Sequence, residues 1–262
     1  MRRTSDHAGF SLIEMIIVIA ITGIVGSMVA LFLRVPLDSY VAQDRRARLT
    51  DTADTALRRM ARDIRLALPN SVRVTAAGSV VEFLGTRSGG RYRAQGDGSV
   101  GNDNLDFTIA DNSFEVLGPG IAMQAGDRIA VYNLGIPGAD AWAGETLANY
   151  TGAAGSVTSI AIAPKQFPLA SPGNRFQVVD GPVSYVCDPA AGTLTRFWGY
   201  DPAVGVTAAA PRALLATRVS ACSFDYQPGV TERGGLVSMT LSLSLAGETI
   251  RLHANTQVSN QP

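Results

Sequence analysis

The sequence predicts an α+β fold, in which one long N-terminal helix packs on a mainly antiparallel β-sheet domain. Two observations predict the helix. Residues 10–33 are almost entirely apolar, and between positions 49 and 68 apolar residues recur at spacings of three and four. A third observation predicts the strands: from residue 72 onward, short segments alternate apolar and polar residues between turns rich in Gly, Asp and Pro.

The apolar stretch at 10–33 predicts a transmembrane segment. As a helix it would extend about 36 Å, and a bilayer core is about 30 Å thick. Arg2 and Arg3 precede it, so the positive-inside rule predicts a cytoplasmic N-terminus with the bulk of the chain outside. An ordinary secretory signal would have a shorter apolar core and a small-x-small cleavage site, whereas Arg34-Val35-Pro36 follows here.

One acidic residue, Glu14, stands near the start of this apolar stretch. On insertion scales an ionisable group inside a span costs about 2.5–3.5 kcal/mol, so such a group is expected to have a partner. A plain membrane anchor has no use for this carboxylate. The position of Glu14 therefore favours a segment with a second task besides anchoring.

The residues around Glu14 carry a family resemblance. A short basic leader ends in Gly9 and is followed by Phe10-Ser11-Leu12-Ile13-Glu14 and an apolar helix. This arrangement resembles the prepilin motif of type IV pilins and of type II secretion pseudopilins. The resemblance implies that a prepilin peptidase cuts between Gly9 and Phe10, removes the leader at 1–9, and methylates the new amino group of Phe10.

Cleavage would give Glu14 a candidate partner. Glu14 would be the fifth residue of the processed chain, close to the cationic amine of Phe10, and opposite charges attract strongly in a medium of low dielectric constant. Between neighbouring subunits this pairing would fix the axial step of each incoming subunit. The alternative is a carboxylate that reaches the lipid headgroups without a partner.

After Pro36 the sequence predicts more helix, ending before Pro69. The apolar stripe comprises Leu49, Ala53, Ala56, Leu57, Met60, Ile64, Ala67 and Leu68. Opposite charges at i,i+4 predict three surface pairs, Asp44–Arg48, Asp54–Arg58 and Arg59–Asp63. We therefore expect one long helix over 10–68, kinked or interrupted near Pro36, whose stripe lies across a sheet.

Charge gives no reason to expect nucleic acid as a partner. Lys+Arg and Asp+Glu balance at 22 each over the whole chain. The second half of the helix has an arginine excess, but a nucleic-acid site would add interleaved aromatic residues, and only Tyr40 is available. A solvated face, or one that meets acidic neighbours in a filament, is the favoured interpretation.

The remaining residues, 69–262, predict a β-rich periplasmic or extracellular domain. In its final hairpin, Ala246-Gly247 forms the turn, and Leu243 pairs with Ile250, Leu241 with Leu252, Ser242 with Arg251 and Thr240 with His253. The other predicted strands are Val80–Leu84, Leu105–Ile109, Phe114–Leu117, Arg128–Tyr132, Val157–Ile162, Phe176–Val179, Val183–Cys187 and Leu194–Trp198.

The chain has two cysteines, Cys187 and Cys222. Two cysteines cannot build a zinc site alone, and no second pair of ligands accompanies them. Outside the cytoplasm a disulfide is the natural interpretation, and it would contribute about 4 kcal/mol in the loop-entropy model while pinning the segment 199–213. The alternative is two buried free thiols.

Candidate sites for chemistry are few, and we expect no enzyme. The chain has two histidines: His7 lies in the leader, and His253 falls on the polar face of the final hairpin. The loop 96–106 is rich in Asp, Asn and Gly and could hold calcium, but it lacks the spacing of an EF-hand, so a turn-rich loop is favoured. Otherwise we expect no cofactor, no metal site and no catalytic residue.

Segments of the β domain add a finer resemblance, to the MshO-like minor pilins of mannose-sensitive haemagglutinin (MSHA) pilus biogenesis. The segments are 81–84, 89–93, 175–187, 194–200 and 222–226. The resemblance implies a low-abundance subunit that primes or caps a pilus. Minor J-type pseudopilins of type II secretion and the PilW group share this architecture, and K-type tip pseudopilins typically lack the glutamate present here as Glu14.

The partners implied are a prepilin peptidase, other major and minor pilins, and the inner-membrane pilus assembly platform. The implied location is the bacterial inner membrane, crossed once, with the β domain in the periplasm and later on the pilus at the cell surface. A different class stays open, in which the β domain is a tip adhesin or ligand-binding module. The aromatic residues Phe197, Trp198 and Tyr200 could form its platform, although core packing is favoured.

Overall fold

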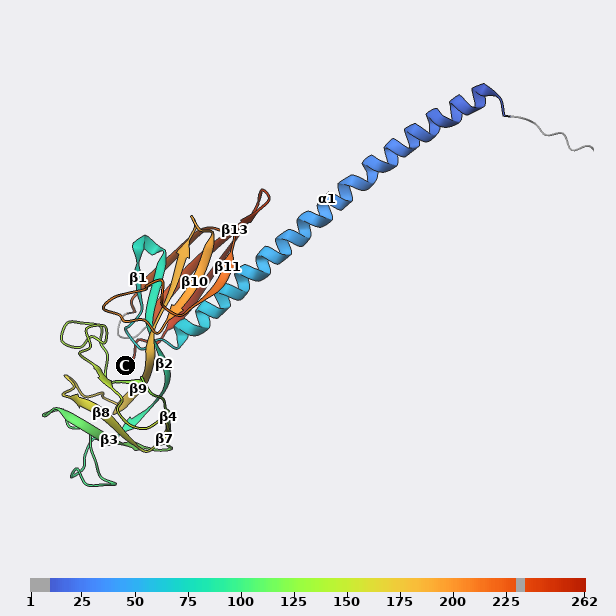
Figure 1. The fold of residues 1–262 in the computed structure, drawn as a ribbon. Coiled ribbons are helices and arrows are strands. Elements are labelled where there is room, and N and C mark those ends of the chain that lie inside the picture. Colours follow the sequence, from blue (N-terminus) through green and yellow to red (C-terminus); the bar gives the residue numbers. More distant parts are fainter. Residues whose placement is uncertain (1–9, 230–233) are drawn as a thin grey trace, which may run out of the picture. The chain divides into compact units, whose positions relative to one another are not determined.

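The computed structural model describes residues 10–229 and 234–262, and for residues 33–38 it describes only the backbone. It contains one long helix, α1 (Leu12–Arg65), followed by antiparallel strands and one short 3-10 helix, η1 (Ala76–Gly78), which confirms the predicted α+β class (Figure 1). The chain divides between Arg48 and Leu49 into two compact units.

The first unit contains the apolar part of α1. Leu12–Phe32 is long and apolar enough to cross a membrane, and within residues 10–229 and 234–262 nothing buries it. Its hydroxyl groups bond to the helix backbone: Thr22 Oγ1 donates to the carbonyl of Val18 at 2.6 Å and Ser27 Oγ to that of Ile24 at 2.8 Å. These bonds satisfy polar groups that lipid could not satisfy.

The second unit begins with the amphipathic part of α1. The predicted apolar stripe is confirmed, because each of its members is buried: Leu49, Ala53, Ala56, Leu57, Met60, Ile64, Ala67 and Leu68. Of the three predicted surface ion pairs, Asp44–Arg48 and Asp54–Arg58 form, at 2.9 and 2.7 Å. The Arg59–Asp63 prediction is wrong, because Asp63 turns toward the sheet and binds Tyr185 and Arg196.

The helix ends at Arg65, three residues before the predicted end at Leu68. The backbone of residues 66–68 pairs with strand β2 (Val80–Tyr92) instead of continuing the helix. The carbonyl of Leu66 accepts the amide of Thr86 at 2.9 Å, and the amide of Leu68 donates to the carbonyl of Leu84 at 2.8 Å. The sheet therefore ends the helix before Pro69 is reached.

The larger sheet is built around β2 and β9 (Arg175–Asp188), which pair over most of their length. Its main path runs β11-β10-β9-β2-β3-β8, with β1 beside β2, and β5 beside β9 and β6. The other strands are β1 (Arg73–Thr75), β3 (Asp111–Leu117), β5 (Arg128–Ala130), β6 (Leu147–Asn149), β8 (Ser159–Lys165), β10 (Thr193–Trp198) and β11 (Arg212–Thr217). A separate pair consists of β4 (Ile121–Met123) and β7 (Gly155–Val157).

Several strand predictions need correction. The predicted strand Val157–Ile162 is broken at Thr158, between β7 and β8. Phe176–Val179 and Val183–Cys187 are parts of one continuous strand, β9. The strand predicted at Leu105–Ile109 does not form. There, Asp106 accepts hydrogen bonds from both the amide and the hydroxyl of Thr108, at 2.7 and 2.6 Å, so a local side-chain turn replaces the strand ladder.

The smaller sheet contains β12 (Val219–Gln227), β13 (Gly235–Leu245) and β14 (Glu248–Val258), in that order. The predicted register of the final hairpin is confirmed, since Leu243 lies opposite Ile250 and Leu241 opposite Leu252. Ala246 and Gly247 both have positive φ, 50° and 83°, as a two-residue type I′ turn requires.

Two large apolar cores and a smaller cluster around Leu68, Leu84 and Val179 hold the described part of the β domain together. The first lies between the stripe of α1 and both sheets, and contains Met60, Phe83, Tyr185, Met239 and Leu241 among others. The second contains no helix residue and is built from segments between Tyr92 and Val178. In Figure 1, β3, β8, β4 and β7 gather in this second lobe, away from β10, β11 and β13.

A disulfide joins Cys187 to Cys222, with 6.5 Å between the Cα atoms. Cys187 belongs to β9 of the larger sheet and Cys222 to β12 of the smaller sheet. The bond therefore links the two sheets that cover the helix, rather than only pinning the loop segment 199–213.

Candidate functional site

The start of α1 carries the sequence-predicted assembly residues. Gly9 lies outside the described residues, while Phe10 is 78% exposed and Glu14 is exposed in the first helical turn. A carboxylate in the first turn is stabilised by the positive end of the helix dipole. Phe10 and Glu14 thus lie at the same end of one helix, and both side chains are exposed among the described residues.

Ser11 caps this helix, which the sequence analysis missed. Its Oγ accepts the amide of Glu14 at 3.3 Å, and its carbonyl accepts the amides of Glu14 and Met15 at 3.1 and 3.3 Å. The signal was present, because Ser-x-x-Glu before an apolar run is the pattern of a capping box. The cap fixes the first turn and so the direction in which the backbone presents Glu14.

A polar clamp fixes the amphipathic part of α1 on the larger sheet. Asp63 accepts hydrogen bonds from the hydroxyl of Tyr185 at 2.7 Å and from Nε of Arg196 at 2.8 Å. Burial, and then the neighbouring Asp63, raise the pKa of Tyr185 well above its usual value, so this hydroxyl stays a donor. The Arg196 guanidinium also lies over the ring of Trp198, 5.0 Å from its centre.

A second polar cluster surrounds Glu82, which is 7% exposed. Its carboxylate accepts bonds from Nε of Arg73 at 2.7 Å, the hydroxyl of Tyr200 at 2.8 Å and Oγ of Ser184 at 3.1 Å. Tyr200 also contacts Ser184 directly, and burial raises the pKa of Tyr200. The cluster holds Tyr200 against the sheet, so this aromatic residue packs as core and is not free to form a ligand platform.

The acidic side chains of the loop 96–106 accept hydrogen bonds from nearby residues. Asp97 accepts from the amide and hydroxyl of Ser99, Asp103 from the hydroxyl of Ser113, and Asp106 from Thr108. These bonds to Ser99 and Thr108 lower the pKa of Asp97 and of Asp106. Within residues 10–229 and 234–262, no group of three or more His, Cys, Asp or Glu side chains could hold a metal ion.

The predicted surface position of His253 agrees with the structure. Its ring Nδ1 lies 3.0 Å from the hydroxyl of Thr240 on the exposed face of the final hairpin. The other histidine, His7, lies outside the described residues. In the described part of the chain no carboxylate is hydrogen-bonded to the His253 ring, so the acid–histidine pair of a hydrolytic triad is not assembled there.

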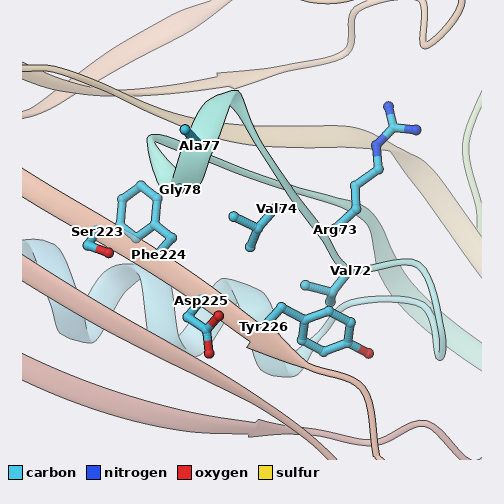
Figure 2. A pocket seen from close by; sticks show the side chains of 9 residues that line it. All are labelled: Val72, Arg73, Val74, Ala77, Gly78, Ser223, Phe224, Asp225 and Tyr226. Carbon is cyan, nitrogen blue, oxygen red and sulfur yellow. The ribbon is translucent and has the colours of Figure 1, made fainter.

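A groove opens between the edge of β1 and the edge of β12 (Figure 2). Its volume is about 560 Å³. One wall runs along residues 72–78 and the other along Ser223–Tyr226. The two walls belong to different sheets, and β1 and β12 are not hydrogen-bonded to each other.

Comparison with known proteins identifies one feature. Residues 4–30 match the prokaryotic N-terminal methylation motif, which is the prepilin signal of type IV pilin-like proteins. No curated protein and no solved structure matches the chain. The match spans Gly9, Phe10 and Glu14 and ends at residue 30, so it covers part of the leader and most of the apolar part of α1 but none of the β domain.

Proposed function

We propose that this chain is a pilin-like assembly subunit whose leader at 1–9 is removed by a prepilin peptidase. The observation that carries the proposal is the methylation motif at residues 4–30, leading into a helix whose apolar segment Leu12–Phe32 is not buried by any part of the chain that the structure describes. A membrane covers such a segment before assembly, and the helices of neighbouring subunits cover it afterwards.

The same features support different roles for different segments of the chain. Residues 10–33 anchor the subunit in the inner membrane, and Glu14 pairs with the amine of Phe10 on a neighbouring subunit. Arg2 and Arg3 support a cytoplasmic N-terminus, and the Cys187–Cys222 disulfide supports an oxidising compartment for residues 69–262. The partners are other major and minor pilins and the inner-membrane assembly platform.

Within this class, we propose a minor subunit of an MSHA-type pilus. Support comes from the resemblance to MshO-like minor pilins, whose segments fall on β2, β9, β10 and β12. These strands supply the core that covers the helix. A J-type pseudopilin of a type II secretion system is the alternative, and the content of the neighbouring genes distinguishes the two systems.

The N-terminus of the processed protein tests the proposal. Purified from cells that contain prepilin peptidase, the protein should begin at N-methylated Phe10, as read by N-terminal sequencing and mass spectrometry. Cells lacking the peptidase should retain residues 1–9. An N-terminus other than Phe10 in peptidase-containing cells would overturn the proposal.

A minor subunit should also be scarce in the filament. Quantitative mass spectrometry of sheared pili should find this chain at a small fraction of the most abundant pilin. Abundance equal to that of the major subunit would contradict the minor role while leaving the pilin-like class intact.

A further inference from the structure

We propose that the arginine face of α1 binds the acidic segment 97–111 of a second copy of this chain. The arginine face comprises Arg58, Arg59, Arg62 and Arg65, and the acidic segment carries Asp97, Asp103, Asp106 and Asp111. The inference rests on the proposed function only for the filament, which holds the two copies side by side.

The arginine face lies on the side of α1 opposite the buried stripe, and all four of its side chains are exposed. Arg58 pairs with Asp54, and Arg65 donates to Thr256. Arg59 and Arg62 have no hydrogen bond or ion pair with any residue that the structure describes. Like charges at i,i+3 and i,i+4 repel one another, so this row of arginines calls for an acidic partner.

The helix dipole accounts for only part of this face. Positive charge stabilises a helix C-terminus, but the effect falls off within the last turn. That turn holds Arg62 and Arg65. Arg58 and Arg59 lie about one turn earlier, so their presence needs another reason.

The acidic segment has the opposite charge. Between Arg93 and Arg128 the chain has six Asp or Glu residues and no lysine or arginine. Two of the six have basic partners, since Glu115 pairs with Arg93 and Asp127 with Arg87. The remaining four, which are the aspartates of the acidic segment, have no basic partner among the described residues.

Hydrogen bonds gather these four carboxylates. Ser113 donates its hydroxyl to Asp103 at 2.7 Å and its amide to Asp111 at 3.4 Å. The amide of Asp106 also donates to Asp111, at 2.7 Å. Asp97 is exposed and the other three are partly exposed. Bonds from neighbouring hydroxyl groups lower the pKa of Asp97 and of Asp106, so both stay ionised at neutral pH.

The two surfaces do not meet within one described copy. α1 ends beside the middle of β2, where the amide of Thr86 donates to the carbonyl of Leu66 at 2.9 Å. β2 then continues to Tyr92, about 20 Å further at 3.3 Å per residue, and the acidic segment follows it. A second copy, staggered relative to the first, can bring its acidic segment to the arginine face.

The matching charges of the two surfaces decide the choice of partner, because four carboxylates meet four guanidinium groups. Each exposed ion pair is weak and salt-dependent, but complementary charge selects the orientation, and filament neighbours are held at high effective concentration. The contact is heterologous, since different surfaces of the two copies meet. One contact leaves an arginine face and an acidic segment open, so it also suits a subunit present in few copies.

Photocrosslinking between two differently tagged full-length copies in one cell tests this inference. Benzoylphenylalanine at Thr55, which is exposed one turn before Arg59 on the same side of α1, should crosslink the two tagged copies. After trypsin digestion the adduct should lie in the peptide 94–128, which no internal lysine or arginine interrupts. The matched control is the same probe at Ser220, which is exposed on β12.

Three outcomes would overturn the inference. They are the absence of an adduct between the two tagged copies, an adduct outside the peptide 94–128, and an equal yield from the probe at Ser220.

A charge exchange provides the second measurement. Arg59→Asp combined with Arg62→Asp in the probe-bearing copy should lower the crosslink yield about tenfold, since like charges would then meet. A partner copy with Asp97→Arg and Asp106→Arg should restore the yield to within about twofold of wild type. Arg59→Lys with Arg62→Lys keeps the charge and should keep most of the yield, and thermal unfolding checks that each variant folds.

Equal yields from the Arg59→Asp, Arg62→Asp copy and from wild type would contradict the pairing. So would a charge-exchanged pair whose yield does not recover.

The N-terminus measured in the same cells separates the two proposals. If the protein begins at N-methylated Phe10 and the two tagged copies do not crosslink, the pilin-like function stands and the contact between copies fails. If it begins elsewhere, the function itself fails.

Discussion

The two halves of α1 differ in where their apolar surface is covered. Leu12–Phe32 is apolar apart from Glu14 and a few hydroxyl residues, and none of the described residues buries it. From Leu49 to Ile64, the apolar residues form one stripe, which the two sheets bury almost completely. The first half therefore depends on its surroundings for cover, whereas the second half is part of a folded domain.

Because of this difference, we expect the two halves of α1 to affect different properties of the protein. Substitutions in the second half should change the free energy of unfolding of the β domain. Substitutions in the first half should change membrane insertion or filament formation and leave that free energy unaltered. Four predictions test this separation, in order of their expected effect on unfolding.

A methionine occurs in each half and allows a matched comparison. Met60 is 0% exposed and Met28 is 65% exposed. Met60→Asp buries an unpaired carboxylate and should destabilise the domain by about 5 kcal/mol or more. Met28→Asp should leave the unfolding transition unchanged but reduce membrane insertion. Urea unfolding in detergent, followed by the fluorescence of Trp142 and Trp198, measures the first effect and membrane fractionation the second.

Equal unfolding transitions for Met60→Asp and wild type would contradict the separation between the two halves. So would a large loss of domain stability in Met28→Asp.

The disulfide should give the next largest effect, since it ties together the sheets that cover the stripe. Cys187→Ala combined with Cys222→Ala should lower the free energy of unfolding by about 4 kcal/mol, because the unfolded chain gains loop entropy. Reduction of the wild-type protein with dithiothreitol should cause the same loss. A double variant as stable as the oxidised protein would show that packing alone holds the two sheets together.

The clamp at Asp63 should contribute less. Asp63→Ala leaves the Tyr185 hydroxyl and the Arg196 guanidinium without their shared acceptor, so we expect a loss of about 1.5–3 kcal/mol. The control is Asp54→Ala on the solvated side of the helix, whose pair with Arg58 should contribute at most about 0.5 kcal/mol. Equal losses from both variants would mean that the Asp63 bonds act like an ordinary surface pair.

Glu14→Ala should have no effect on unfolding. We expect normal membrane insertion and an unchanged urea transition, but fewer pili, because the incoming subunit loses the partner for the Phe10 amine. Electron microscopy of whole cells counts the pili. Glu14→Gln keeps the shape of the side chain without its charge and should behave like Glu14→Ala. Normal piliation in both variants would contradict the charge-pairing mechanism.

Local patterns made much of this fold predictable. The methylation motif, the apolar stripe and the register of the final hairpin each depend on residues close together in sequence. Ser11 carried an equally local signal, as the first residue of a capping-box pattern, and only its meaning was missed.

Long-range polar contacts were the part that local patterns could not predict. Asp63 is four residues from Arg59, yet it binds Arg196, 133 positions away, because the sheet brings that side chain to the helix. The cluster at Glu82 likewise joins residues about a hundred positions apart. The groove depends on the division into two sheets, which strand periodicity does not reveal.

The burial of the apolar stripe of α1 has a consequence for the synthesis of the chain on the ribosome. Arg65 at the end of α1 donates to Thr256 on β14, 191 positions later. At about 5–20 residues per second, a ribosome needs roughly 10–40 s to cover that distance. During this interval the smaller sheet cannot cover the stripe from Leu49 to Ile64, because β13 and β14 do not yet exist. The nascent subunit thus has two apolar helical surfaces without their final cover, the segment Leu12–Phe32 and the part of the stripe that the smaller sheet buries last.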